Sequence, residues 1–247
     1  MKRITLSLLL LLLVTFSCSP RGKVYRIGVD PSFFPLELLG KDYNVFAFTN
    51  DLLKKIGRKE RIEFVRITMS WDNVVDGLQK GLYEGILSGL PVNLITKDEF
   101  SFSDRIINTG SVLIVRQKEK VKSWKDMKGK SVAVEMHTEA AQIVESHKDV
   151  LIRFFESLPE ALSKVEFGHY DGVMVPNLAA IGYIEDLYKG QLKIVLGPFG
   201  NDGLRLVTLK DEEPELMYRF NRGLDKLQHE SNFKKLLAKW DLIPEKQ

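Results

Sequence analysis

Two hydrophobic periods alternate along the chain. Short apolar runs predict strands at 25–29, 62–67, 83–88, 131–134, 150–155, 172–175, 192–196 and 204–209. Between them, segments with apolar residues every three or four positions predict helices. These helices end near Gly57, Gly81 and Leu187 or span 139–145, 213–229 and 232–240.

Polar residues at the predicted helix starts indicate where the helices begin. Ser70 and Thr138 stand at N-cap positions, where a side-chain oxygen can accept from a free backbone N–H. Ser157 and Glu160 flank Pro159 in the spacing of a capping box. The helices predicted from hydrophobic spacing therefore also have polar start signals.

The alternation of strands and helices predicts parallel sheet covered by helices, and its restart near residue 131 predicts two lobes. No linker rich in proline, glycine or serine separates them, so we expect two strand crossings, near 112–116 and 204–209. The expected fold is α/β, with two Rossmann-like lobes joined by two hinge strands. Residues 24–113 and 208–247 should form a discontinuous first lobe, and 114–207 the second. Ligands bind beyond the carboxyl ends of such strands, which points to the turns after Val29, Ser88, Val134 and Val175.

The first residues predict the compartment. Lys2 and Arg3 precede an apolar run over 4–16, which is typical of a secretory signal and too short to span a membrane. Cys18, the only cysteine, ends this run and resembles the lipidated cysteine of a bacterial lipobox. We expect 1–18 to be a signal peptide and the mature protein to be extracytoplasmic, anchored through lipid on Cys18. Ordinary cleavage nearby, giving a free periplasmic protein, is the alternative.

Composition narrows the possible partners. The net charge of +3 falls to +1 when Lys2 and Arg3 leave with the signal peptide, so the mature chain is nearly neutral. Such a balance does not favour binding to nucleic acid or to a membrane surface. The four histidines show no metal-ligand spacing, so neither a metal nor a cofactor is expected.

Eight short motifs follow one another in a recognisable order. They are Asp-Pro-Ser-Phe-Phe-Pro-Leu-Glu at 30–37, Phe-Thr-Asn-Asp-Leu at 48–52, Trp-Asp at 71–72, Leu-Gln-Lys-Gly at 78–81, Phe-Ser at 102–103, Asp-Met-Lys-Gly-Lys at 126–130, Asp-Gly-Val at 171–173 and Lys-Trp at 239–240. Over nearly all of 24–242 the chain thus resembles the family-3 extracellular solute-binding proteins, the polar amino-acid binders of bacterial ABC importers. The resemblance implies a fold like the type II periplasmic binding proteins, a monomer that closes on a small ligand, and a membrane permease as partner.

The resemblance also implies three devices that grip an α-amino acid. The first is an aromatic sandwich, for which Phe33 and Trp71 stand in place. The second is an arginine that binds the ligand carboxylate. Thr96 stands at its position and Pro91 at that of a supporting threonine, while Lys97 follows directly as a point charge.

The third device is an acidic residue that holds the ligand ammonium, and here the chain has Pro176 followed by Asn177. An anion-binding Gly-Thr pair is also altered, because His137 replaces the glycine before Thr138. With both charged anchors missing, the ligand should not be a standard α-amino acid recognised in the usual way. A one-residue slip that uses Lys97 and Asn177 is the alternative.

Three further residues complete the expected site. Ser88 and Gly89 belong to the turn after a predicted strand, and Asp30 stands where relatives often read the far end of the ligand. Alternatively, Asp30 caps its own turn.

The sequence therefore predicts the solute-binding component of an ABC importer, which captures a small polar solute (amino-acid-like, peptide or amine) by hinge closure and has no catalytic residues. One alternative is a receptor or scaffold without a transport ligand. The other is a dehydratase-like lyase that uses cleft acids, for which Glu37, Asp30, Glu135 and His137 are the candidates.

Overall fold

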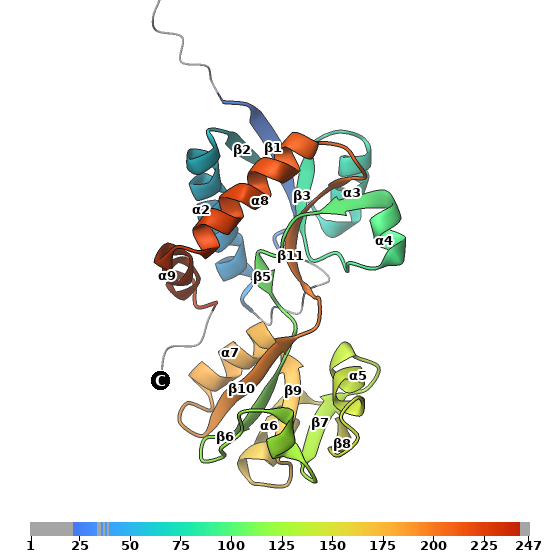
Figure 1. Ribbon diagram of the computed structural model, residues 1–247, viewed down its shortest axis with the longest axis vertical. Coiled ribbons are helices and arrows are strands. Elements are labelled where there is room, and N and C mark those ends of the chain that lie inside the picture. The colour runs from blue at the N-terminus through green and yellow to red at the C-terminus, as the bar shows by residue number, and fades with distance from the viewer. Residues whose placement is uncertain (1–21, 34–35, 37, 39, 243–247) are drawn as a thin grey trace, which may run out of the picture.

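The computed structural model describes residues 22–242 except 34, 35, 37 and 39. The expected signal peptide, Cys18 and Glu37 lie outside these residues. Within them the chain forms two lobes stacked along the long axis of the molecule (Figure 1), which confirms the predicted two-lobed α/β fold. No helix among the described residues has both the length and the apolar character needed to cross a membrane.

The first lobe is built on a six-stranded sheet with the order β2-β1-β3-β11-β4, in which β5 also pairs with β11. Its strands are β1 (Val24–Val29), β2 (Glu63–Thr68), β3 (Gly85–Ser88), β4 (Phe100–Phe102), β5 (Ile107–Asn108) and β11 (Gly203–Leu209). Its helices are α2 (Asp42–Glu60), α3 (Trp71–Gln79), α4 (Leu94–Glu99), α8 (Pro214–Gln228) and α9 (Ser231–Lys239). The C-terminal helices therefore return to the lobe that contains the first strand.

The second lobe is built on a five-stranded sheet with the order β10-β6-β9-β7-β8. Its strands are β6 (Ser111–Arg116), β7 (Ser131–Glu135), β8 (Leu151–Phe155), β9 (Gly172–Pro176) and β10 (Leu192–Phe199). Its helices are α5 (Glu139–Glu145), α6 (Leu158–Glu166), α7 (Asn177–Asp186) and a short 3₁₀ turn at Trp124–Met127.

Apolar side chains fill both faces of each sheet. In the first lobe, Phe48 and Leu52 of α2 pack with Phe220 of α8 on one face, while Val74 of α3 packs with Tyr83 on the other. The second lobe has one core under α6 and α7 and another under α5. Burial on both faces explains why the strands read as continuous apolar runs.

The sheets are mixed, although the alternation predicted parallel ones. β1 runs parallel to both β2 and β3, and β7 runs parallel to both β8 and β9. In contrast, β11 is antiparallel to β3, and β6 is antiparallel to β9. Both β6 and β11 enter their sheet directly from the other lobe. They start at the edge where the parallel strands end, so they must run in the opposite direction.

The lobe boundaries differ from the expected ones by a few residues. The expected change at 113/114 falls inside β6, which pairs wholly with the second sheet. The expected change at 207/208 falls inside β11, which pairs with β3, β4 and β5 of the first sheet. The crossings are therefore 109–110 and 200–202. A strand's own apolar pattern does not identify the sheet that it joins.

Three predicted helix signals act differently from expectation. Helix α2 continues past Gly57 to Glu60, and Arg61 ends it with a left-handed backbone (φ 54°). Gly57 is needed for close packing instead, because a Cβ there would lie 2.7 Å from the carbonyl oxygen of Ile62. Ser70 and Ser157 occupy the N-caps of α3 and α6, but neither side chain makes a capping hydrogen bond. The capping box predicted at Ser157 is wrong.

Candidate functional site

A cavity of about 330 Å³ lies between the two lobes, a volume within the range of small-molecule sites. The first lobe lines it with residues that follow β1 and β3, and the second with residues that follow or end β7 and β9. The lining residues are Leu36, Gly89, Pro91, Thr109, Ser111, Glu135, Thr138, Glu139, Ala140, Phe155, Met174, Pro176 and Asp202. The four turns expected to hold the site thus lie around one cavity, although none of Val29, Ser88, Val134 and Val175 itself lines it.

The start of α5 forms one wall. Thr138 caps this helix as predicted, accepting from the N–H of Ala141 (3.2 Å) and donating to the carbonyl of Glu135 (2.7 Å). His137, just before the cap, is exposed and has a left-handed backbone with φ 64°. This conformation favours glycine, although histidine adopts it more readily than most residues. His137 does not line the cavity.

Residues of both lobe crossings, Thr109 and Asp202, line the cavity. The backbone N–H of Gly110 donates to Asn108 Oδ1 (3.0 Å). Asn177, at the start of α7, donates from its side chain to the carbonyl of Asn108 (3.3 Å) and from its backbone to that of Gly110 (3.1 Å). Asn177 therefore holds a crossing and does not line the cavity. Thr109, which lies between Asn108 and Gly110, does line the cavity.

Carboxylates dominate the charge of the cavity. Glu135 ends β7, Glu139 begins α5 and Asp202 lies in the second crossing, and all three are solvent-exposed. Although much of Glu139 is exposed to solvent, partial desolvation of its carboxylate and the nearby charge of Asp202 raise its pKa, and the backbone N–H of Asn201 partly offsets that rise. No lysine, arginine or histidine is found among the lining residues.

The expected aromatic sandwich does not form in this structure. Phe33 is only 1% exposed and belongs to the core of the first lobe, where its ring centre lies 6.5 Å from that of Phe46. Trp71 packs against the core formed by Val74 and Tyr83. Neither ring lines the cavity. Both residues match the family motifs in type and position, but Phe33 is buried in the core and Trp71 is half-buried against another core cluster.

Several other expected site residues stabilise turns. Asp30 is buried and accepts from the backbone N–H (3.0 Å) and the hydroxyl (2.8 Å) of Ser32, as the turn-capping alternative predicted. The Ser88 hydroxyl accepts from the N–H of Leu90 (3.0 Å). Neither residue lines the cavity, whereas Gly89 does.

Thr96 also stabilises its own loop. It forms a reciprocal capping box with Asn93 at the start of α4, and its hydroxyl donates to the carbonyl of Pro91 (2.7 Å). Pro91 lines the cavity, but Thr96 and the exposed Lys97 do not. The alternative in which Lys97 and Asn177 replace the missing anchors is therefore not seen in this structure, because neither side chain lines the cavity.

Sequence reasoning missed four polar lining residues, which are Thr109, Ser111, Glu139 and Asp202. Glu139 directly follows the predicted N-cap Thr138, which was the one signal that could have indicated it. Thr109 and Asp202 come from crossings whose positions were misplaced by a few residues. Their meeting depends on both crossings running together.

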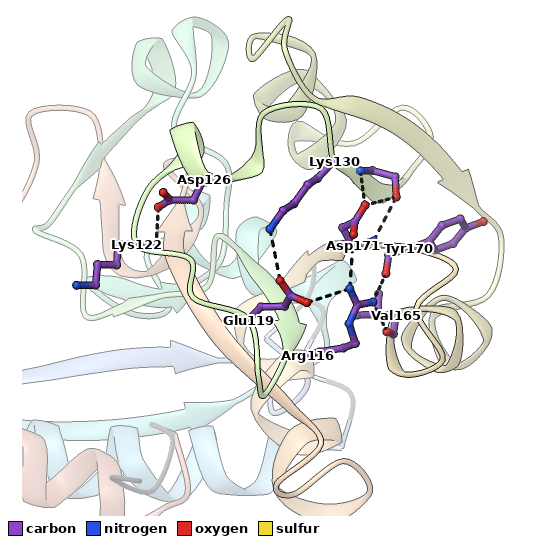
Figure 2. Close-up of polar contacts among 9 residues, drawn as sticks. Arg116, Glu119, Lys122, Asp126, Lys130, Val165, Tyr170 and Asp171 are labelled. Atoms are coloured by element: carbon purple, nitrogen blue, oxygen red, sulfur yellow. Dashed lines mark hydrogen bonds and ion pairs between the residues drawn. The ribbon is translucent and has the colours of Figure 1, made fainter.

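A second polar cluster lies in the second lobe and does not line the cavity (Figure 2). Arg116 donates to the carbonyls of Val165 (3.0 Å) and Tyr170 (2.8 Å), and it pairs with Glu119 (3.1 Å) and Asp171 (3.5 Å). The cluster ties the end of β6 to the residues that precede β7 and β9, so its role is structural. No group of three possible metal ligands was found among the described residues.

Comparison with known proteins agrees with this architecture. The model of the family described as bacterial extracellular solute-binding proteins, family 3, matches residues 25–242. A probable histidine-binding protein of Neisseria gonorrhoeae is 25% identical over 225 residues, covering 89% of this chain and 83% of that protein. ABC transporter arginine-binding protein 1 of Escherichia coli (strain K12) is 22% identical over 244 residues, covering 97% and 99%.

A solved structure is similar in fold. The L-cystine solute receptor of Neisseria gonorrhoeae, in an unliganded open conformation, superposes with a TM-score of 0.70 at 19% identity. The match covers 90% of this chain and 93% of that one. At this identity the likeness concerns the fold alone.

Proposed function

The chain belongs to the family-3 bacterial extracellular solute-binding proteins, and from this membership we propose that it captures a small polar solute for an ABC importer. The observation that carries the proposal is the cavity between the lobes, lined by turns at the carboxyl ends of strands from both. A ligand held there would contact Gly89 and Pro91 of one lobe and Thr138 and Pro176 of the other. Such contacts favour closure about the two crossings.

The usual anchors for an α-amino acid are altered in this proposal. Pro91 and Pro176 line the cavity, and neither has a side-chain polar atom or a backbone N–H to offer. Thr96 lies outside it. A hydrogen bond to a charged group contributes about 1.5–3 kcal/mol, so losing two anchors would remove about two to four decades of affinity. The solute should therefore be gripped by other groups.

The cellular setting is part of the same proposal. The family supplies a small-molecule ligand and a permease in the cytoplasmic membrane as partners. We place the protein outside that membrane as a monomer, held near the permease by lipid on Cys18. Mass spectrometry of the mature N-terminus tests the anchor, because an unmodified terminus or cleavage at another residue would contradict it.

Binding without turnover is the activity that we propose, since the relatives named above are binding proteins. A thermal-shift screen of the mature domain against amino acids, short peptides, polyamines and organic acids tests it. A solute at about 100 times its dissociation constant adds roughly 2.7 kcal/mol to the stability of the folded state. The same solute should lower the radius of gyration in X-ray scattering as the lobes close.

Each other outcome of the screen has a distinct meaning. If no solute raises the melting temperature, the receptor or scaffold function is favoured over transport. If a solute is converted to product during the incubation, a lyase is favoured. If a common amino acid stabilises strongly, the interpretation of Pro91, Thr96 and Pro176 as lost anchors is wrong.

A further inference from the structure

A second hollow, of about 430 Å³, lies on the first lobe where α2 ends beside β2, and we call it the α2/β2 hollow. Three cationic residues line it, Lys54 and Arg58 from α2 and Arg66 from β2. Glu63 is the one carboxylate among the described residues that line it. None of the three cations forms an ion pair within the described part of the chain, whereas their neighbour Lys59 pairs with Glu230 (2.6 Å). The hollow is therefore locally positive, although the mature chain as a whole is nearly neutral.

Arg66 is the most informative of the three cations. It is half-buried, with its guanidinium carbon 4.2 Å from the centre of the Phe46 ring, and its Nη1 donates to the carbonyl of Phe46 (3.1 Å). Burial lowers the pKa of Arg66, and no carboxylate among the described residues offsets that effect. A partly buried cation without a counter-charge is costly, and the planar guanidinium suits the oxygens of a phosphate. The environment of Arg66 therefore favours a bound anion.

The end of α2 accounts for only part of this positive charge. A helix carries partial negative charge at its last turn, which stabilises cations there and explains Arg58 and Lys59. Lys54 lies more than one turn before the helix end, and Arg66 lies on a strand, so neither is explained in this way. Three cations from two elements around one hollow fit an anionic ligand better than they fit the helix end.

The chain that leads back to Cys18 leaves the lobe at the rim of this hollow. Gly22 packs so closely there that a Cβ on it would lie 2.2 Å from the carbonyl oxygen of Arg61. The carbonyl of Lys23 accepts from the backbone N–H of Glu63 (3.0 Å), a lining residue. Cys18 precedes Gly22 by four residues, a length of chain that spans at most about 14 Å. A lipid on Cys18 would therefore bring membrane headgroups within reach of the hollow.

Taking the lipid on Cys18 proposed above, we propose that the α2/β2 hollow binds the phosphate headgroup of an anionic phospholipid in the membrane that carries the anchor. Lys54, Arg58 and Arg66 bind the phosphate oxygens. In Figure 1, β1 begins at the end of the first lobe that faces away from the second lobe, and β2 runs parallel to it. The headgroup site therefore leaves the cavity between the lobes free for the solute.

The anchor makes a weak headgroup site sufficient. One lysine or arginine near an anionic membrane surface strengthens binding about fivefold, which corresponds to about 1 kcal/mol. Three cations together give about a hundredfold, too little to hold a free protein on a membrane at low lipid concentration. A lipid on Cys18 keeps the headgroups close, so the contact at the hollow decides which face of the first lobe meets the membrane.

Vesicle flotation at high lipid concentration tests the site on the mature chain beginning at Ser19, which lacks the anchor cysteine. One set of vesicles contains phosphatidylglycerol mixed with phosphatidylcholine, and the other contains phosphatidylcholine alone. We expect the protein to float with the first set only, and to be released as added salt screens the charges. Equal recovery with both sets, or no recovery with phosphatidylglycerol, would overturn the proposal.

Substitutions separate the hollow from general attraction to the membrane. Lys54 and Arg58 are both exposed, so replacing them should leave the fold intact. Lys54→Gln/Arg58→Gln should weaken partitioning into phosphatidylglycerol vesicles roughly 25-fold. Lys125→Gln/Lys128→Gln is the matched control, because it removes the same charge from exposed residues of the second lobe, and it should weaken partitioning about twofold at most. Equal losses in two variants that melt like the wild type would contradict the site.

Two further measurements separate this proposal from its alternatives. A protein that ignores phosphatidylglycerol vesicles but binds inorganic phosphate in calorimetry, with loss in Lys54→Gln/Arg58→Gln, would make the hollow a site for a free anion and overturn the lipid assignment. Solute capture should be the same in that variant and in the wild type, because the hollow and the cavity share no lining residue. Failure of the solute-binding function is therefore distinguishable from failure of the headgroup site.

Discussion

At the scale of single residues, the motifs that identify the family mostly serve the fold. Asp51, from the Phe-Thr-Asn-Asp-Leu motif, accepts from Lys239 Nζ (2.6 Å) and Trp240 Nε1 (3.2 Å) of the closing Lys-Trp motif. Asp171, from Asp-Gly-Val, accepts from the backbone N–H (2.9 Å) and hydroxyl (3.0 Å) of Ser131. Motifs of this kind therefore predict the architecture well and the ligand poorly.

Thr96 gives a direct test at this scale, because it occupies the arginine position yet completes, as the N3 residue, the capping box that Asn93 begins at the start of α4. Thr96→Ala should lower the free energy of unfolding by about 1 kcal/mol, the usual value of an N-terminal cap, and should not change ligand affinity. Urea denaturation and calorimetry measure the two effects. Thr138→Ala is the comparison, because Thr138 both caps a helix and lines the cavity, so both quantities should fall. Loss of binding in Thr96→Ala without loss of stability would show that Thr96 belongs to the site.

At the scale of elements, the two crossings are packed against each other. A Cβ on Gly110, in the first crossing, would lie 1.7 Å from the carbonyl oxygen of Phe199, which ends β10. A Cβ on Gly203, which begins β11, would lie 2.4 Å from the carbonyl oxygen of Ile107. The glycines thus allow the two backbones to touch where the chain passes between the lobes.

Gly110→Ala should therefore destabilise the protein by more than 2 kcal/mol or prevent folding, because the blocking atom is backbone and cannot move aside. Gly182→Ala is the control. Gly182 lies within α7, and its nearest neighbour to a new Cβ is the flexible end of Lys41 at 3.8 Å. Alanine there should be neutral or stabilise by up to about 1 kcal/mol. Thermal unfolding of both variants tests the pair, and equal melting temperatures would contradict the crowding argument.

At the scale of the whole molecule, the crossings and α7 join the lobes on one side. Leu178 and Ile181 of α7 belong to the same core cluster as Ile106 and Leu204 of the first lobe. In Figure 1, α4 and α5 lie on the other side of the molecule from α7. Apolar contact thus resists separation near α7, so a closing motion should pivot there.

Acid should destabilise the molecule through carboxylates in both lobes. Burial raises the pKa values of Glu119 and Asp171, but hydrogen bonds and nearby cations outweigh it, so both lie below their usual range. The pKa of Asp51 in the first lobe is lowered chiefly by its hydrogen bond from Lys239. A folded-state pKa below the unfolded value contributes stability that is present above the unfolded pKa and lost as the pH falls through the folded one. The melting temperature should therefore drop steeply below about pH 4, near the unfolded carboxyl values.

Replacing one of these carboxylates isolates its contribution to the loss of stability in acid. Asp171→Asn should lower the melting temperature at pH 7 and make it less sensitive to acid, because Ser131 and Arg116 lose a charged partner. Asp149→Asn is the control, since Asp149 and its partner Lys128 are mostly exposed and their charges lie 3.7 Å apart. Exposed pairs of this kind contribute little. Identical pH profiles for the two variants would show that the cluster around Arg116 does not stabilise the second lobe.

The sequence by itself determined the elements, the two lobes and the order of the motifs. Hydrophobic periodicity reports which face of a segment is buried, and it placed the longer strands and helices to within a few residues but missed the short α4, β4 and β5. It also located the turns around the cavity, because strand ends follow from strand positions. Thr138 was assigned correctly as a cap because its signal is local.

Only the tertiary structure decided which side chains line the cavity. Phe33 has the right residue type at the right position, but its ring turned into the core, and Asp30 bound its own turn. Glu139 and Asp202 come together from segments more than sixty residues apart in the chain, through a crossing that belongs to neither lobe. Side-chain direction and long-range approach depend on how both lobes pack, and no local pattern in the chain encodes them.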